Sequence, residues 1–176
     1  MNLFADTPDW TGFPAATFSP CGLYRYTLRR TFRRSGPIWM VTMLNPSTAD
    51  AERNDPTVAR MCARARRAGA GALLVANLFA WRATNPKELA KVPDPVGPGN
   101  DVAIVGMAKR ADVHIVAWGA DEAIHLPGSS GRERHIEVRE LIERTVAGRL
   151  LCLGTSKDGH PRHPLYLASE VELTPW

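Results

Sequence analysis

Polar side chains follow the apolar stretches of this chain at the points where those stretches end. Residues 43–50 read Met-Leu-Asn-Pro-Ser-Thr-Ala-Asp and come after the apolar run 37–41. Similar runs end at Asn77, at Trp118-Gly119 and at Gly154-Thr155. Amides orient a ligand, hydroxyls donate hydrogen bonds, and a carboxylate can act as a general base. Ligands of an open α/β sheet bind outside the carboxyl ends of its strands, so we expect the site at these segments.

Strand and helix patterns alternate along the chain, as an α/β fold requires. The continuous apolar runs indicate strands covered on both faces, and residues 23–32 alternate like a strand with Tyr24, Tyr26 and Leu28 on one buried face. Helices are predicted at residues 55–68, 86–91, 100–110 and 132–146, and residues 158–167 are predicted as a loop followed by one short helical turn. The predicted fold is a three-layer α/β/α sandwich with a central, mostly parallel sheet of about four strands.

The predicted domain organisation is simple. Residues 1–20 carry three prolines and no periodicity, which predicts an irregular N-terminal arm. Residues 21–176 form a single α/β domain in this interpretation. No helical segment is apolar over the roughly 20 residues of a membrane span, and we expect a cytoplasmic protein without a membrane partner.

Composition argues against cofactor-dependent classes. The three cysteines, Cys21, Cys62 and Cys152, are far apart in the sequence and support neither a disulfide framework nor an iron–sulfur pattern. No group of histidines and carboxylates has the spacing of metal ligands, so we predict no metal and no cofactor. The oligomeric state stays open.

Arginines cluster on the first predicted helix, and the net charge is +4. Guanidinium groups suit phosphate, and nucleic-acid contacts are assigned to Arg60, Arg64, Arg67 and Arg162. The alternative is a solvated helix face, which charge alone favours.

Three residues are candidates for catalysis: Asn45, Asp50 and His163. Asn45 is expected to orient a water molecule, although it could instead satisfy the turn that starts at Pro46. Asp50 is a candidate general base beside it, whereas Asp55 is better explained as a helix cap. Substrate contacts are predicted from Pro46, Ser47, Thr48, Asn77, Phe79, Arg82, Thr84, Trp118, Gly119 and Pro164.

Four blocks of the sequence resemble the signature of a known family. On residues 43–50, 77–84, 117–119 and 159–167 the chain is identified as a member of a bacterial family catalogued as domain of unknown function 1643. This family carries no assigned activity.

More remotely, the order of the blocks is similar to that of the uracil-DNA glycosylase superfamily. There the first strand ends in a water-positioning motif, a second strand delivers an asparagine that reads the base, and a final His-Pro holds the leaving base. The matching positions here are Asn45-Pro46, Asn77, Trp118-Gly119 and His163-Pro164. The chain departs from the pattern at Ser47-Thr48, where the uracil-specific enzymes have tyrosine, and at Leu165, where they have serine.

The resemblance implies a uracil-DNA glycosylase-like fold and hydrolysis of N-glycosidic bonds in DNA repair. Asn77 would read the flipped base, Phe79 or Trp81 would stack on it, and His163 would stabilise the departing base. Two alternatives remain: a non-catalytic nucleic-acid-binding module, or an enzyme that binds a nucleotide or another small molecule. The predicted partner is accordingly DNA or a nucleotide-like small molecule.

Overall fold

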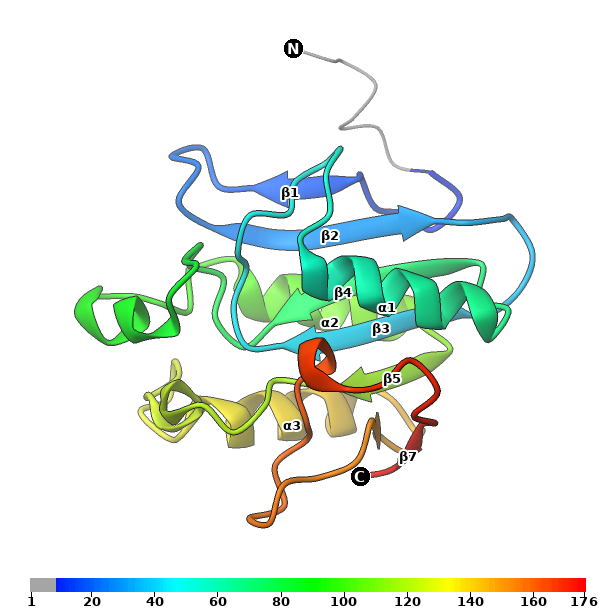
Figure 1. Ribbon diagram of the computed structural model, residues 1–176. Helices are drawn as coiled ribbons and strands as arrows, with labels where there is room; N and C mark the ends of the chain where they lie inside the picture. The colour runs from blue at the N-terminus through cyan, green and yellow to red at the C-terminus, as the bar shows by residue number, and fades with distance from the viewer. Residues whose placement is uncertain (1–8) are drawn as a thin grey trace.

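The computed structural model describes residues 9–176 (Figure 1). Seven strands form one sheet in the order β1-β2-β4-β3-β5-β6-β7. Their bounds are β1 Ala16–Phe18, β2 Arg25–Thr31, β3 Ile38–Met43, β4 Ala72–Asn77, β5 Val113–Val116, β6 Leu151–Cys152 and β7 Thr174–Pro175. The predicted arm comprises residues 1–20. Its residues 1–8 lie outside the described residues, and its residues 16–18 form strand β1.

The α/β class is confirmed, but the prediction of a mostly parallel sheet of about four strands is wrong. Strands β4, β3, β5 and β6 are parallel, while β2 joins β4 antiparallel and β7 joins β6 antiparallel. The sheet is therefore mixed. Strands β1 and β7 are three and two residues long, too short for a periodic pattern, and they form only by pairing with β2 and β6.

The helices lie close to their predicted positions because local sequence signals define them. Helix α1 spans Pro56–Arg67, α2 spans Asn100–Arg110 and α3 spans Arg134–Thr145. Asp55 caps α1 by accepting a hydrogen bond from the Val58 amide at 2.8 Å, and Pro56 opens the helix. Short 3₁₀ helices occur at η1 Pro86–Lys91, η2 Glu122–His125 and η3 Pro164–Tyr166. Of these, η2 was not predicted.

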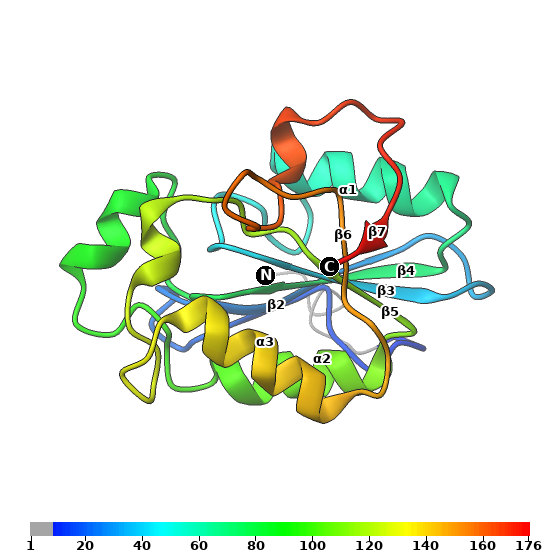
Figure 2. The same cartoon turned by 90° about the horizontal axis from the view of Figure 1, so that it is seen from below.

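Helices cover both faces of the sheet, as the continuous apolar runs indicated. Helix α1 and η3 lie on one face, and α2 and α3 lie on the other (Figure 2). Trp39 and Val41 of β3 pack in the cluster that includes Met61 of α1, whereas the alternate residue Met40 packs with Ile104 of α2. All residues of β3 and β4 are buried.

Strands β3 and β5 are neighbours whose connections leave in opposite directions. From β3 the chain passes through α1 to β4 on one side, and from β5 it passes through α3 to β6 on the other side. Such a switch point leaves a crevice at the carboxyl ends of the two strands. None of the helices in residues 9–176 combines the length and apolar character of a membrane span.

Candidate functional site

A cavity of about 770 Å³ opens at this switch point, within the 300–1,000 Å³ range of small-molecule sites. Its walls come from the first residue of β2, the end of β3 and the loop after it, the start of α1, the loops after β4, β5 and β6, and the segment around η3. The predicted site residues that line it are Asn45, Ser47, Thr48, Thr84, Trp118, Gly119, Arg162 and His163. The structure thus brings together side chains from segments more than 100 residues apart in the chain.

Asn45 is held in one orientation by two backbone carbonyls. Its Nδ2 donates to the carbonyl of Pro46 at 3.1 Å and to that of Ala83 at 2.7 Å. Both amide hydrogens are therefore used, and the side-chain oxygen remains to accept a hydrogen bond. The two roles considered for Asn45 are compatible, since the amide nitrogen ties the loops together while the oxygen can serve the cavity.

His163 reaches the cavity from the cap position of η3. Its Nδ1 accepts a hydrogen bond from the Leu165 amide at 3.3 Å, so the neutral ring carries its proton on Nε2. Burial lowers the pKa of His163, and the negative charge of Asp55 only partly opposes this shift. The ring is neutral at pH 7, and Nε2–H is available as a donor.

Gly119 explains how His163 can approach the end of β5. It has φ +83°, a conformation that side chains disfavour, and a Cβ atom there would lie 3.3 Å from the His163 Cβ. Any larger residue at this position would crowd the histidine.

Asp55 also lines the cavity, although the sequence assigned it only to the helix cap. The cap is confirmed, and the carboxylate is 8% exposed. It is near enough to His163 to affect the pKa of that ring. Asp55 therefore joins Asn45 and His163 in the same cavity.

Arg25 is the site residue that sequence reasoning missed. It is the first residue of β2, lines the cavity and is 2% exposed. Its guanidinium donates to the Ala49 carbonyl at 2.9 Å and to Oδ1 of Asn77 at 3.1 Å, while Nε has no partner. Burial lowers the pKa of Arg25 to about 10, and the carboxylate of Asp55 opposes the shift. Arg25 thus remains a buried cation at neutral pH.

The strand pattern concealed Arg25 because it predicted only one buried face for β2. The structure buries Arg25 and Thr27 as well as Leu28, whereas Tyr26 on the predicted buried face is only partly buried. The residues around β2 cover both of its faces. The burial of both faces of β2 is evident only from the position of this strand in the sheet.

Asn77 and Phe79 do not line the cavity, so the base-reading and stacking roles predicted for them need correction. Asn77 is 2% exposed and holds the Arg25 guanidinium, and Phe79 is fully buried in the core. Backbone hydrogen bonding between the segments of β3 and β4 continues past the strand ends. The Leu78 amide donates to the Met43 carbonyl, and the Phe79 amide donates to the Leu44 carbonyl. This pairing keeps the segment inside the domain.

Asp50 also lies outside the cavity lining. Its Oδ1 accepts hydrogen bonds from the amides of Arg53 and Glu52, and these bonds lower the pKa of Asp50. The carboxylate closes its own turn. The structure therefore places Asp55, and not Asp50, in the cavity with Asn45.

Pro46, Arg82 and Pro164 are the other predicted contacts that the lining does not include. Arg82 donates to the carbonyl of Gly22 at 3.0 Å, and its guanidinium lies 4.9 Å from the ring centre of Phe18. These two contacts join Arg82 to the hairpin formed by β1 and β2.

Three arginines of α1 contact backbone carbonyls of the C-terminal segment, residues 167–171. Arg60 donates to Leu167, Arg67 donates to Ser169, and Arg64 binds four carbonyls of that segment. Arg64 is 6% exposed. These hydrogen bonds join α1 to the C-terminal segment, the phosphate contacts of Arg60, Arg64 and Arg67 stay a prediction, and Arg162 lines the cavity.

Comparison with known proteins identifies a family and no activity. The family described as "Protein of unknown function (DUF1643)" matches residues 25–165, a range that begins at Arg25 and includes Asn45, Asp55 and His163. The chain belongs to this family. No curated protein and no solved structure matches it.

Proposed function

We propose that this family member binds a nucleotide-like small molecule in the cavity and hydrolyses its N-glycosidic bond. The observation that carries the proposal is the buried cation of Arg25 in the cavity wall, in the same cavity as Asn45, Asp55 and His163. The cation supports an anionic ligand. The three other side chains support the chemistry.

Arg25 favours a phosphate group because nothing in the described part of the chain forms a salt bridge with it. A buried charge is costly unless an opposite charge or a full set of hydrogen bonds compensates it. Its Nε is unpartnered, and a phosphate oxygen would supply both the charge and the acceptor. The first residues of α1 in the cavity wall add the positive end of a helix dipole.

The cavity also offers aromatic surface for a planar base. Tyr166, which is 83% exposed, lines it from η3, whereas Trp118 lines it from the loop after β5 but is 1% exposed. The Tyr166 ring lies 6.1 Å from that of His163. Stacking on such rings is tolerant of base identity, so it fits a nucleotide without specifying which one.

The lining residues divide the steps of hydrolysis among them. The oxygen of Asn45 orients a water molecule, and Asp55 accepts a proton from that water as it attacks the sugar carbon. The C–N bond breaks with its electron pair moving to the base nitrogen, and Nε2–H of His163 donates to the departing base. This assignment replaces Asp50 with Asp55 and removes Asn77 from contact with the base.

A small ligand fits better than DNA because three arginines of α1, Arg60, Arg64 and Arg67, donate hydrogen bonds to backbone carbonyls. DNA remains the second candidate, favoured by Arg162 in the lining and by the net charge of +4. The two differ in salt dependence, since each phosphate contact of a polynucleotide adds to the slope of affinity against salt concentration.

The binding experiment compares nucleoside monophosphates, nucleosides, inorganic phosphate and short DNA oligomers by calorimetry. We expect monophosphates to bind, and Arg25→Met to weaken them at least about tenfold, the loss of one charge-assisted hydrogen bond. Arg34→Met at an exposed position is the matched control and should bind as the parent does. Equal binding of nucleosides and monophosphates, or an unchanged Arg25→Met variant, would contradict the phosphate assignment. Tighter binding of DNA with a steep salt slope would select the second candidate.

The activity experiment follows release of free base from the nucleotides that bind. Asn45→Ala and His163→Gln should each lower kcat by about 100-fold, the contribution of one positioned proton-transfer group. Binding without base release from any nucleotide would reject the hydrolysis and leave only ligand binding.

A further inference from the structure

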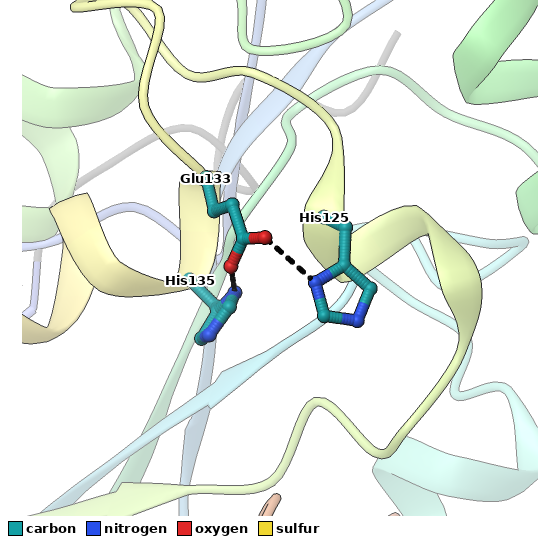
Figure 3. Close-up of side chains that lie close together, drawn as sticks. All are labelled: His125, Glu133 and His135. Carbon is teal, nitrogen blue, oxygen red and sulfur yellow. Dashed lines mark hydrogen bonds and ion pairs between the residues drawn. The ribbon is translucent and has the colours of Figure 1, made fainter.

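Two histidines and a carboxylate from neighbouring segments come together outside the catalytic group. His125 ends η2, Glu133 precedes α3, and His135 lies in its first turn. Figure 3 shows the Glu133 carboxylate between the two imidazole rings, with one nitrogen of each ring facing it. One possible ligand atom from each residue lies within 4.8 Å of the other two.

The spacing of these atoms is that of ligands around one metal ion. Nδ1 of His125 lies 3.1 Å from one Glu133 oxygen, and Nδ1 of His135 lies 3.7 Å from the other. Four ligands placed tetrahedrally at zinc bond lengths of about 2.0–2.1 Å are separated from each other by about 3.4 Å. The two observed distances lie on either side of that value, and one ligand atom from each of the three residues lies within 4.8 Å of the others.

The group is also accessible and chemically suited to a metal. The side chains of His125 and Glu133 are 52% and 44% exposed, whereas that of His135 is 12% exposed. A metal ion can therefore reach His125 and Glu133 from solvent and then meet His135, whose side chain is largely buried. Two histidines with one carboxylate form a recurrent donor set for zinc and other divalent transition metals.

His160 connects this group to the cavity. Its ring packs nearly perpendicular to those of His125 and His135, with ring centres 5.7 Å and 5.3 Å away. His160 also lines the cavity, together with Pro161 and Ser156 from the same loop. The histidine group and the cavity therefore share a wall.

We propose that His125, Glu133 and His135 bind one divalent transition-metal ion of the zinc type, with solvent completing the coordination. His135 donates from Nδ1 to the Ile124 carbonyl at 3.0 Å, so metal binding through this atom breaks that hydrogen bond and moves the ring proton to Nε2. The ion joins η2 to the start of α3 beside the loop of His160, and it makes this part of the cavity wall more rigid.

The experiment titrates Zn²⁺ into the chelator-treated full chain by calorimetry and records the visible spectrum of the Co²⁺ form. One equivalent should bind, and the Co²⁺ spectrum should show the intense bands of a four-coordinate site. His125→Ala should weaken zinc by about 100-fold or more, beyond the effect of losing an outer partner. It removes an exposed side chain, so its fold should be retained; Glu133→Gln provides a second variant. His163→Gln, at a histidine outside the group, is the control and should bind zinc like the parent.

His160→Ala tests the three-ligand assignment, because His160 is a packing neighbour and not a ligand. We expect it to weaken zinc by less than about tenfold. A loss as large as that of His125→Ala would overturn the assignment of three protein ligands. Absence of stoichiometric zinc binding, or equal affinity in His125→Ala and the parent, would overturn the metal site itself. Neither result bears on nucleotide binding at Arg25.

Discussion

Arg25 and Arg134 are equally buried but have very different surroundings. Arg134 is 1% exposed and contacts the carboxylates of Asp101 and Glu137 as well as the carbonyl of Leu78. Arg25 is 2% exposed, contacts a carbonyl and an amide oxygen, and leaves Nε without a partner. Arg134 lies where α2 meets α3, and Arg25 lies in the cavity wall.

The difference separates a structural cation from one that is prepared for a ligand. Two carboxylates compensate the burial of Arg134, and the ion pair joins α2 to α3. Burial raises the pKa of Glu137, but hydrogen bonds from Ser130 and Arg134 bring it below its usual value. Arg25 has no such compensation, and its pKa is lowered. An opposing charge from a ligand would therefore be worth more at Arg25 than at any satisfied arginine.

The largest effect is expected from Arg134→Met. Removing one partner of a buried ion pair leaves an uncompensated charge, so the free energy of unfolding should fall by about 3–5 kcal/mol. Chemical denaturation of the purified variant measures it. Arg132→Met is the control, because the pair between Arg132 and Glu140 is exposed and should contribute about 0–1 kcal/mol. Equal losses in the two variants would remove the structural half of the comparison.

Arg25→Met should destabilise less than Arg134→Met. The variant leaves the Ala49 carbonyl and Oδ1 of Asn77 without a donor, at a cost of about 1–3 kcal/mol, and it also removes a buried charge that no carboxylate pairs. Denaturation measures the stability, and inorganic phosphate should raise the Tm of the parent but not that of the variant. If phosphate stabilises both equally, Arg25 is not the ligand cation.

Substitution of Asp55 should change stability less than substitution of the two buried arginines. Two different substitutions also separate its capping role from its proposed catalytic role. Asp55→Ala should cost about 1 kcal/mol through loss of the α1 cap, whereas Asp55→Asn keeps a capping oxygen and should cost less. Asp55→Asn also removes the largest charge effect that opposes the lowered pKa of Arg25. Both variants should lose base release, but the alanine variant should lose more stability than the asparagine variant. An active Asp55→Asn enzyme would exclude Asp55 as the general base.

The smallest effect concerns the pH dependence at His163. Its pKa lies below 6.5 in the native state because the ring is buried, so the unfolded chain takes up the proton first as pH falls. The associated stability is fully present above pH 6.5 and is lost as pH falls through the native pKa. Denaturation at several pH values should show a steeper acid loss in the parent than in His163→Gln. An identical pH dependence in the two proteins would contradict the buried, neutral ring.

Adding phosphate tests whether Arg25 binds an anion, as its contrast with Arg134 predicts. A phosphate at Arg25 brings negative charge into the cavity of His163 and should raise the pKa of that ring. Titration of the His163 resonances by NMR, with and without phosphate, measures the change. His114, which is buried in β5 and bonds to the Ala108 carbonyl, serves as the internal control.

Local signals predicted the helices well and the edges of the sheet poorly. Asp55 and Pro56 define the start of α1, and Gly69 with φ +80° follows its end. The helix predicted at residues 86–91 is η1, and the structure shows that Asn85 caps it by accepting a hydrogen bond from the Lys87 amide. Strand β7 has no such signal because its two residues form a strand only where β6 is already in place.

The candidate site was predicted in part, for a related reason. Asn45 and His163 follow strand ends or turns that can be recognised in the sequence, and both line the cavity. Asn77 follows a strand end equally well but faces Arg25 in the interior. The pattern of the chain places a residue at the end of a strand, but it does not determine the direction of its side chain once neighbouring strands are added.

The sequence by itself determined the α/β class, the helix positions and the strand ends that carry the cavity, because periodicity and capping act within a few residues. Only the tertiary structure decided which cations are paired, which carboxylate shares the cavity with His163, and that His125 meets Glu133 and His135. Burial and charge compensation depend on atoms supplied by distant segments. For that reason Arg25 and Arg134, similar in the sequence, are predicted to differ in function.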